Sequence, residues 1–294
     1  MANLKEIRVR ISSVTSTRQI TSAMKMVSAA KLKRAQDAII QLRPYAEKLS
    51  DIIKNISDNI DASDDVFGKE RPVKNVLIVL ITSNRGLCGA FNSNAIKAAI
   101  GSAYSNYEPQ IKLGKLNFVC IGKKGYDFLR TRNFPLASVH NELLDKPSFE
   151  KVMPVVDEIL GMYASGKVDK VVLVYNKFKN AGVQILTEEQ FLPIPKKQKQ
   201  VKEKLSGIRT DYLYEPSKEE IMLELIPKSL RIDFYKAILD SHASEHGARM
   251  TAMHKATDNA SDMIKKLTLS YNKARQAAIT GEILEIVGGA EALK

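Results

Sequence analysis

Apolar residues near both ends of the chain recur at alternating spacings of three and four, which is the pattern of a helical coiled coil. In the N-terminal part this pattern runs through Leu4, Ile7, Ile11 and Val14, and then through Ile39, Leu42, Ala46, Leu49, Ile53, Ile56 and Ile60. No glycine interrupts residues 2–60, and Pro44 is the only proline there. The pattern therefore predicts one long helix from Ala2 to about Ile60.

Between these two stretches the strict spacing falls on polar residues. Continued from Val14, it selects Arg18, Thr21, Lys25 and Ser28. The apolar residues of the same stretch lie at other positions, which are Ile20, Ala23, Met24, Val27 and Ala30. The apolar stripe either moves to another face of the helix here or becomes thin, and the sequence leaves both possibilities open.

A second long helix is expected from Ser217 to the end of the chain. Its three-four spacing selects Met250, Met253, Thr257, Ala260, Ile264, Leu267, Tyr271, Ala274, Ala278 and Gly281. Two such helices bury their stripes against each other or against other chains. The small residues of the last turns would make a thin end, which suits insertion into a narrow sleeve.

The middle of the chain has the order strand, turn, helix, which is typical of an α/β domain. Strands are expected at residues 73–82, 116–121, 171–175 and 183–191. A turn at residues 82–94 is expected to lead into a helix through Tyr104, a turn at residues 122–125 into a second helix through Arg130, and residues 152–165 are expected to form a third. The prediction is therefore an α/β fold combined with a long α-helical coiled coil. Residues 1–60 and 209–294 form an antiparallel two-helix coiled-coil shaft, and residues 73–208 form an inserted, Rossmann-like domain with a mostly parallel sheet that binds no nucleotide.

The net charge of the chain and its distribution limit the kinds of partner that the chain could bind. The 294 residues carry 45 Lys and Arg against 33 Asp and Glu, a net charge of +12. The first 36 residues hold Lys5, Arg8, Arg10, Arg18, Lys25, Lys31, Lys33 and Arg34 with Glu6 as their acidic residue. An acidic protein surface, a nucleic acid or anionic lipid would complement this charge, and a solvated face with no dedicated partner stays open. The two cysteines are expected to be free thiols.

Two glycine turns follow predicted strands, where a dinucleotide-binding fold carries its phosphate loop. Residues 86–89 read GLCG and residues 122–125 read GKKG. Neither spacing matches G-x-G-x-x-G or the P-loop pattern. Tight turns whose glycines serve backbone geometry are therefore favoured over a nucleotide site.

Two further motifs have a chemical interpretation. Residues 242–246, HASEH, fit the H-x-x-E-H pattern of a metalloprotease family, but a zinc hydrolase needs a third ligand and a cleft, and this segment lies on a long helix. Cys88 has no partner for a catalytic triad at a suggestive spacing, so a packed thiol is favoured over a nucleophile. The tyrosines of DYLYEP, residues 211–216, suit either packing or protein contact.

Several long motifs, in order along the whole chain, resemble the γ subunit family of F-type ATP synthases. They are residues 5–36 (KEIRVRISSVTSTRQITSAMKMVSAAKLKRAQ), 43–47 (RPYAE), 82–92 (TSNRGLCGAFN), 211–216, 244–260 (SEHGARMTAMHKATDNA) and 271–293 (YNKARQAAITGEILEIVGGAEAL). His246 and Gly247 depart from residues that the family often has. The basic loop 196–204 is a segment in which relatives vary in length and charge.

The resemblance implies a non-catalytic central-stalk rotor subunit, without cofactor or metal, in a proton-transporting ATP synthase. In the family, the coiled coil stands inside a ring of α and β subunits, and the globular domain sits on the membrane ring of c subunits beside ε. Proton flow turns the c ring and γ together. The eccentric shaft changes the nucleotide affinities of the β sites and so couples rotation to ATP synthesis and hydrolysis and regulates the ATPase.

By position in these motifs, the resemblance implies contacts of the shaft with loops of the β subunits. The residues concerned on the C-terminal helix are Arg275, Gln276 and Thr280, and those on the facing helix are Met24 and Lys25.

Two further sets of contacts follow from the same resemblance. The NRGLCG turn, with Arg85 and Cys88, would lie near an acidic loop of β. Tyr212, Tyr214 and Glu215 would meet the c ring and ε. The partners expected are thus α, β, ε and the c ring, with no nucleic acid and no insertion of this chain into the membrane.

The expected location is the cytoplasmic side of a bacterial inner membrane, as a peripheral subunit, because Met1 directly precedes the opening helix without an Arg-rich presequence. Two other classes are kept as alternatives. One is a basic coiled-coil protein that binds nucleic acid, and the other is an enzyme, either a Rossmann-like oxidoreductase or a zinc hydrolase. The coupling ion and the size of the c ring depend on other subunits.

Overall fold

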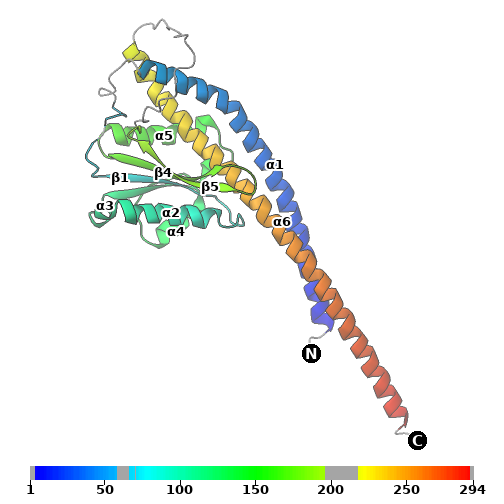
Figure 1. Cartoon of the computed structure of the whole chain (residues 1–294). Helices are drawn as coiled ribbons and strands as arrows, with labels where there is room; N and C mark the ends of the chain where they lie inside the picture. Colours follow the sequence, from blue (N-terminus) through cyan, green and yellow to red (C-terminus); the bar gives the residue numbers. More distant parts are fainter. Residues whose placement is uncertain (1–3, 58–65, 70, 196–217, 292–294) are drawn as a thin grey trace, which may run out of the picture. The chain divides into compact units, whose positions relative to one another are not determined.

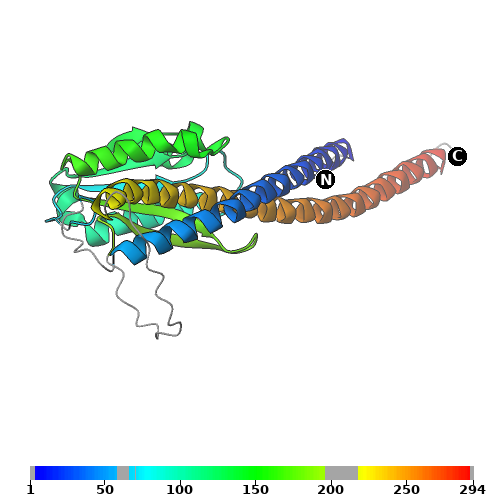
Figure 2. The ribbon, with the colours of Figure 1, turned by 90° about the horizontal axis from the view of Figure 1, so that it is seen from above.

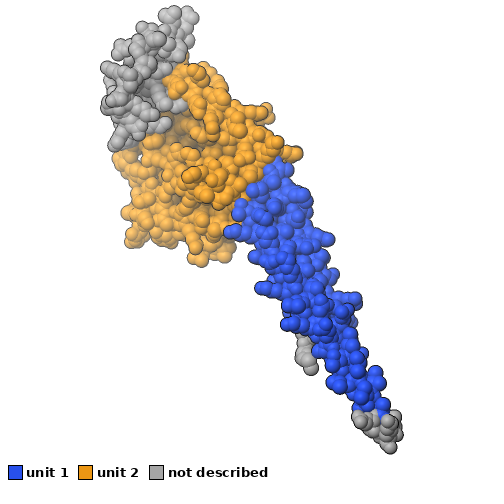
Figure 3. Space-filling model, turned by 45° about the vertical axis from the view of Figure 1, so that its right-hand side comes forward, with its two compact units in different colours: residues 1–30, 249–294 blue, residues 31–248 orange. Residues whose placement is uncertain are grey.

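The structure, a computed structural model, describes residues 4–57, 66–69, 71–195 and 218–291 (Figure 1). The chain forms two compact units, unit 1 from residues 1–30 and 249–294 and unit 2 from residues 31–248 (Figure 3). Both long helices, α1 (Leu4–Ser57) and α6 (Lys218–Glu291), contribute to both units. The two long helices predicted from the apolar spacing are therefore present.

Within unit 1, α1 and α6 run in opposite directions. Lys25 lies beside His254, with 3.4 Å between Nζ and Nδ1, and Thr21 lies beside Thr257, with 2.8 Å between the two hydroxyl oxygens. The residue number falls along α6 as it rises along α1, so the pair is antiparallel.

Unit 2 contains a five-stranded sheet in the order β3-β2-β1-β4-β5. The strands are β1 (Val76–Ile81), β2 (Leu116–Ile121), β3 (Leu136–Val139), β4 (Lys170–Phe178) and β5 (Gln184–Leu192). β1 pairs in parallel with β2 and β4, and β2 pairs in parallel with β3, whereas β4 and β5 form an antiparallel hairpin. The order of the first four strands is that of a doubly wound sheet, which changes direction between β1 and β4.

Helices cover both faces of this sheet (Figures 1 and 2). One face packs against α5 (Phe149–Ala164) and the part of α6 that belongs to unit 2. The other packs against α2 (Phe91–Asn106) and α4 (Lys123–Thr131), with the short α3 (Glu108–Lys112) at its margin. A 3₁₀ turn, η1, spans Glu142–Leu144.

Strand β1 is buried on both sides, and its side chains alternate between the two cores. Leu77, Val79 and Ile81 pack toward α5 and α6, and Val76, Ile78 and Leu80 pack toward α2 and α4. This explains why the strand is a continuous apolar run in the sequence. Cys120 lies in the second core, where burial raises the pKa of its thiol to about 12. Cys88 and Cys120 are both free thiols, as predicted.

The predicted fold class is confirmed: long N- and C-terminal helices accompany a central, largely parallel α/β sheet. The sequence does not predict β3, which has four residues of alternating half-buried and exposed side chains and no long apolar run. The α3 and η1 segments are also too short to have a periodic signal. The division into a shaft of residues 1–60 and 209–294 and a domain of residues 73–208 stays a prediction.

Candidate functional site

The seam between the helices of unit 1 keeps a single three-four register. On α6, Met253 and Ala260 are buried, and the other predicted seam positions from Met250 to Gly281 are half-buried. On α1 the register continues through polar residues, since Thr21 and Ser28 are 8% and 3% exposed. The sequence leaves open whether the apolar stripe moves to another face or becomes thin. In the structure it becomes thin and stays on the same face.

The buried hydroxyls of this seam are satisfied locally. The Thr21 hydroxyl donates to the carbonyl oxygen of Arg18 over 3.0 Å, and the Ser28 hydroxyl donates to that of Met24 over 2.7 Å. Such bonds to the preceding turn allow serine and threonine to lie inside a helix pair. Met24 itself is half-buried.

Because the seam stays in register, several apolar residues of α1 face outward. Ile20 is 60% exposed and Val27 is 58% exposed. On the side that faces α6, Lys25 Nζ lies 3.4 Å from His254 Nδ1, and the same His254 nitrogen lies 3.4 Å from Asp258 Oδ2. Unit 1 thus presents apolar side chains on its outer face and a lysine at the edge of its seam.

The last turns of α6 expose the residues that the resemblance selects. Arg275, Gln276 and Thr280 are exposed, whereas Ala274 and Ala278 on the seam side are half-buried. Several large apolar side chains of these turns are also exposed, by about half to seven tenths of their surface: Ile279, Ile283, Leu284, Ile286 and Val287. Exposed apolar side chains gathered at one end of a helix are typical of protein interaction sites.

A hydrogen-bonded cluster shapes the turn that follows β1. The Ser83 amide donates to Asn92 Oδ1 over 2.9 Å, and Asn92 Nδ2 donates to Ser83 Oγ over 2.7 Å and to Cys88 Sγ over 3.2 Å. Ser83 Oγ in turn donates to the Arg85 carbonyl oxygen over 2.7 Å. These bonds fix the turn to the first turn of α2.

The same turn separates the two residues selected in it. Cys88 is 1% exposed, whereas the Arg85 side chain is exposed. Leu87 between them has a φ of 64° and is 63% exposed. A leucine in the left-handed region is strained, and here the strained backbone points an apolar side chain into solvent beside an arginine. Arg85 thus lies on the surface of the turn, and Cys88 supports the turn from inside.

The glycines of the second turn serve close packing, as the sequence analysis favoured. Gly122 has a φ of 105°, and a Cβ atom there would collide with the Thr82 carbonyl oxygen. A Cβ atom on Gly125 would lie 2.9 Å from Thr82 Oγ1, which accepts a hydrogen bond from the Gly125 amide over the same distance. These two glycines bring α4 against the end of β1.

The H-x-x-E-H segment is buried in unit 2. His242 and His246 are 9% and 4% exposed, and their Nε2 atoms are 3.2 Å apart, a hydrogen-bond distance. The described part of the chain contains no group of three or more side chains placed to hold a metal ion. The two histidines therefore lie in a packed helix face and not in an open cleft.

Tyr212, Tyr214 and Glu215 lie outside the described residues. Of the helices that the structure describes, none has an apolar stretch long enough to span a bilayer. Sequence reasoning did not select Leu87 or the apolar residues Ile283 and Ile286. For the two isoleucines of α6, the available signal was a position off the three-four register, which leaves them outside the seam. Leu87 lies in the turn after β1, where no such register exists.

Comparison with known proteins gives concordant results. The family model described as ATP synthase matches residues 3–293. The ATP synthase gamma chain of Flavobacterium johnsoniae is 56% identical over 294 residues, and that of Cytophaga hutchinsonii is 53% identical over 294 residues; each alignment covers 100% of this chain and 99% of the relative.

Solved structures share the fold. A chain of the Euglena gracilis mitochondrial ATP synthase, in a structure of the OSCP/F1/c-ring part, is 20% identical with a TM-score of 0.68, covering 99% of this chain and 94% of its own length. A chain of the Tetrahymena thermophila mitochondrial ATP synthase, from a structure of its central stalk and c ring, is 25% identical with a TM-score of 0.58. That match covers 81% of this chain and 99% of the Tetrahymena chain.

Proposed function

This chain belongs to the gamma chain family of ATP synthases, and on that premise we propose that it is the central-stalk rotor of such an enzyme. It couples proton-driven rotation of the c ring to ATP synthesis and hydrolysis at sites formed by the α and β subunits, and it regulates their ATPase activity. The observation that carries this function is the helix pair of unit 1. Its seam is buried or half-buried, while its outer faces expose apolar and basic side chains for a surrounding partner.

In this function the chain transmits torque and does no chemistry of its own. A rotor changes the occupancy of catalytic conformations only if each orientation contacts them differently. The seam register supports this requirement, because it leaves exposed apolar residues such as Ile20 and Val27 on one part of the helix pair and polar residues on others. Such an uneven surface favours one conformation of each β subunit over the others.

The proposed contacts with β loops lie on both helices. Arg275, Gln276 and Thr280 are exposed and so available to a partner. Lys25, beside His254, adds positive charge on α1, and Met24 adds a half-buried apolar edge. Basic side chains that meet acidic loops would set orientation and association rate more than affinity.

The turn after β1 is proposed to meet an acidic loop of β through the exposed Arg85, while the buried Cys88 holds the turn in shape. Tyr212, Tyr214 and Glu215 are proposed contacts with ε and the c ring. The shaft is proposed to comprise residues 1–60 and 209–294, and the α/β domain residues 73–208. The relatives are bacterial, and the proposed location is the cytoplasmic side of the inner membrane, as a peripheral subunit.

Reconstitution tests this function. The chain is mixed with the α and β subunits of the same organism, and complex formation and ATP hydrolysis are measured with the chain present or omitted. A stoichiometric complex whose ATPase depends on this chain supports the rotor function. Failure to form a complex, together with binding of DNA or zinc by the chain alone, would support one of the alternative classes.

The contact proposal has its own test in the assembled complex. Arg275→Ala should lower the ATPase rate by about fivefold, which corresponds to loss of about 1 kcal/mol of coupling. The matched control is Lys97→Ala, which removes an exposed cation from α2. Equal activity of the two variants would exclude a coupling role for Arg275 and leave the rotor function itself untouched.

A further inference from the structure

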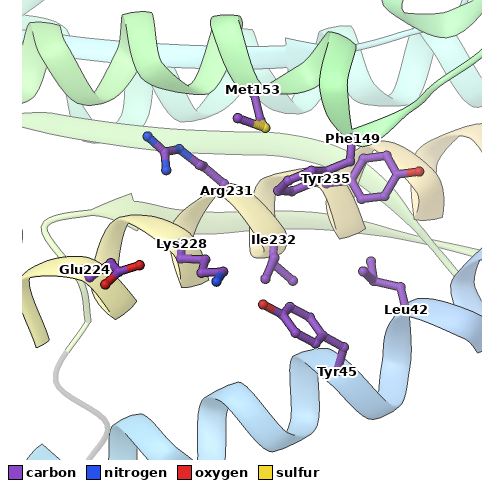
Figure 4. Close-up of a pocket in the computed structure, with 9 residues that line it drawn as sticks. All are labelled: Leu42, Tyr45, Phe149, Met153, Glu224, Lys228, Arg231, Ile232 and Tyr235. Carbon is purple, nitrogen blue, oxygen red and sulfur yellow. The ribbon is translucent and has the colours of Figure 1, made fainter. Parts of the chain in front are cut away.

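A groove of about 450 Å³ lies among three helices of unit 2, and the residues that line it include none of the proposed rotor contacts (Figure 4). α1, α5 and α6 each contribute to its wall. Its volume is in the range of small-molecule sites, which are usually concave, mainly apolar and supplied with few polar groups. The chemistry of the wall therefore indicates what the groove would accept.

Most of the wall is apolar. Ile232 of α6 is 3% exposed and lies at its base, with Leu42 of α1 on one side and Met153 of α5 on another (Figure 4). The rings of Phe149 and Tyr235 meet edge to face with their centroids 5.7 Å apart. Burial raises the pKa of the Tyr235 phenol, so this ring carries no charge at neutral pH. Methionine and aromatic walls adapt to a flexible hydrocarbon.

The charged groups lie on α6. Arg231 is held by Asp157 of α5, with 2.8 Å between Nε and Oδ1. Lys228, one turn earlier, has no carboxylate within ion-pair distance among the residues that the structure describes. Figure 4 shows its side chain and the hydroxyl end of Tyr45 pointing toward one another across the groove. Glu224 lies one further turn back and is exposed.

We propose that this groove binds an amphiphile with one anionic head group and an apolar tail, about the size of a medium-chain fatty acid. The head group pairs with Lys228 beside the Tyr45 hydroxyl, and the tail lies over Ile232 between Leu42 and Met153. Charge complementarity selects this occupant, because the cation of Arg231 is already paired and that of Lys228 is available. Glu224 opposes a ligand with a second negative charge.

The test uses the full-length chain and dodecanoate below its micelle concentration. Binding is measured by isothermal titration calorimetry on the unmodified chain, so that the Tyr45 hydroxyl stays in place. Saturable binding at one site is expected. Dodecyl phosphate, dodecanol and dodecylamine are compared, so that carboxylate, phosphate, neutral and cationic head groups are distinguished.

Two neighbouring substitutions should act in opposite directions. Lys228→Gln should weaken dodecanoate binding by about tenfold, and Glu224→Gln should tighten it by about twofold. Both side chains are exposed on the same helix, so loss of folding would not produce opposite signs. Lys97→Gln on α2 is the matched control and should change nothing. Met153→Glu should abolish binding, with its melting temperature measured to show that it folds.

The proposal is overturned if dodecanol or dodecylamine binds as tightly as dodecanoate. It is also overturned if Lys228→Gln has no effect, or if Met153→Glu folds and still binds. Tight binding of dodecyl phosphate in preference to dodecanoate would keep the site and assign it to phosphate head groups. None of these outcomes bears on the rotor function, which is tested by reconstitution.

Discussion

At the scale of single residues, Gly122 occupies a position that no side chain fits. Its φ of 105° disfavours every L-residue, and a Cβ atom would meet the Thr82 carbonyl oxygen at the end of β1. We expect Gly122→Ala to destabilise the chain by about 2 kcal/mol or more, because strain and collision add. Denaturant unfolding measures the change.

Gly101 is the matched control, since it lies on the exposed face of α2 and a Cβ atom there meets nothing within 4 Å. Gly101→Ala should stabilise the chain by about 0.5–1 kcal/mol by lowering the entropy of the unfolded state. If both substitutions cost the same stability, the close approach of Gly122 to Thr82 would not be the reason for its glycine.

Asp240 makes stability depend on pH. Burial raises the pKa of its carboxyl above the ordinary value of 3.8, although Lys236, Lys177 and Arg43 act to lower it. A raised pKa in the folded state means that the protonated carboxyl stabilises the fold below pH 3.8, and that this contribution is lost as pH rises through the folded-state pKa.

Asp240→Asn removes this titration. The variant should therefore gain stability relative to the unmodified chain as pH rises above 3.8, until the carboxyl of the folded chain is fully ionised. Melting temperatures of both proteins between pH 3.5 and pH 8 measure the difference, on the order of a few degrees per kcal/mol. A difference that narrows with rising pH would contradict the raised pKa.

At the scale of elements, the hydroxyl pair in the seam of unit 1 offers a test of how polar residues hold two helices in register. Thr257 and Thr21 lie with their hydroxyl oxygens 2.8 Å apart. The Thr21 hydroxyl donates to the Arg18 carbonyl oxygen and can therefore accept from the Thr257 hydroxyl, which has the Met253 carbonyl oxygen, also at 2.8 Å, as its alternative acceptor. Thr21→Val and Thr257→Val should each lower the free energy of unfolding by about 0.5–1 kcal/mol. The loss of the cross-helix hydrogen bond is partly offset by burial of the methyl group that replaces the hydroxyl.

The double variant should cost less than the sum of the two, by about 0.5–1 kcal/mol, since two apolar side chains then face each other. Unfolding of the four proteins by denaturant gives this coupling energy. Thr17 is the control position, because it is exposed and its hydroxyl bonds within its own helix to the Ser13 carbonyl over 3.0 Å. Additivity of Thr21→Val and Thr257→Val would show that the pair does not couple the helices.

The elements differ in how far the sequence predicts them. The seam is predictable where apolar residues repeat, as from Ala260 through Ile264 to Leu267, since burial of one helix face explains that spacing. The position of the seam is ambiguous at Thr21 and Ser28. A hydroxyl that donates to a carbonyl oxygen of its own helix can be buried, and here Thr21 and Ser28 are buried while the apolar Ile20 is exposed. Strand β3 is missed because pairing with β2, and not its own sequence, makes it a strand.

At the scale of the whole molecule, the candidate site is harder to predict than the fold, because it consists of surfaces that other chains complete. Exposure of Arg275 follows from the seam register and needs no resemblance. Its proposed contact with β comes from the resemblance to the family, because the sequence around an exposed arginine on a helix does not identify the protein that binds it. The strained Leu87 shows the same limit, because a φ of 64° results from the turn around Cys88.

The exposed apolar end of α6 should favour assembly with partner subunits and lower the solubility of the isolated chain. Ile283 and Ile286 are 55% and 71% exposed, a surface that favours aggregation when no partner covers it. We expect Ile283→Ser combined with Ile286→Ser to raise the soluble yield of the isolated chain severalfold, because the apolar patch is broken. The same variant should bind the α and β subunits about tenfold more weakly, since burying those two side chains stabilises the complex by about 1.5 kcal/mol or more.

Light scattering of the isolated chain and titration of the α and β subunits measure the two effects. Lys265→Ser combined with Lys266→Ser is the control, because it changes two exposed but charged residues of α6. If the isoleucine variant became more soluble and still assembled normally, the apolar end would be an unused surface. Loss of both properties together would mean instead that these residues hold α6 itself in shape.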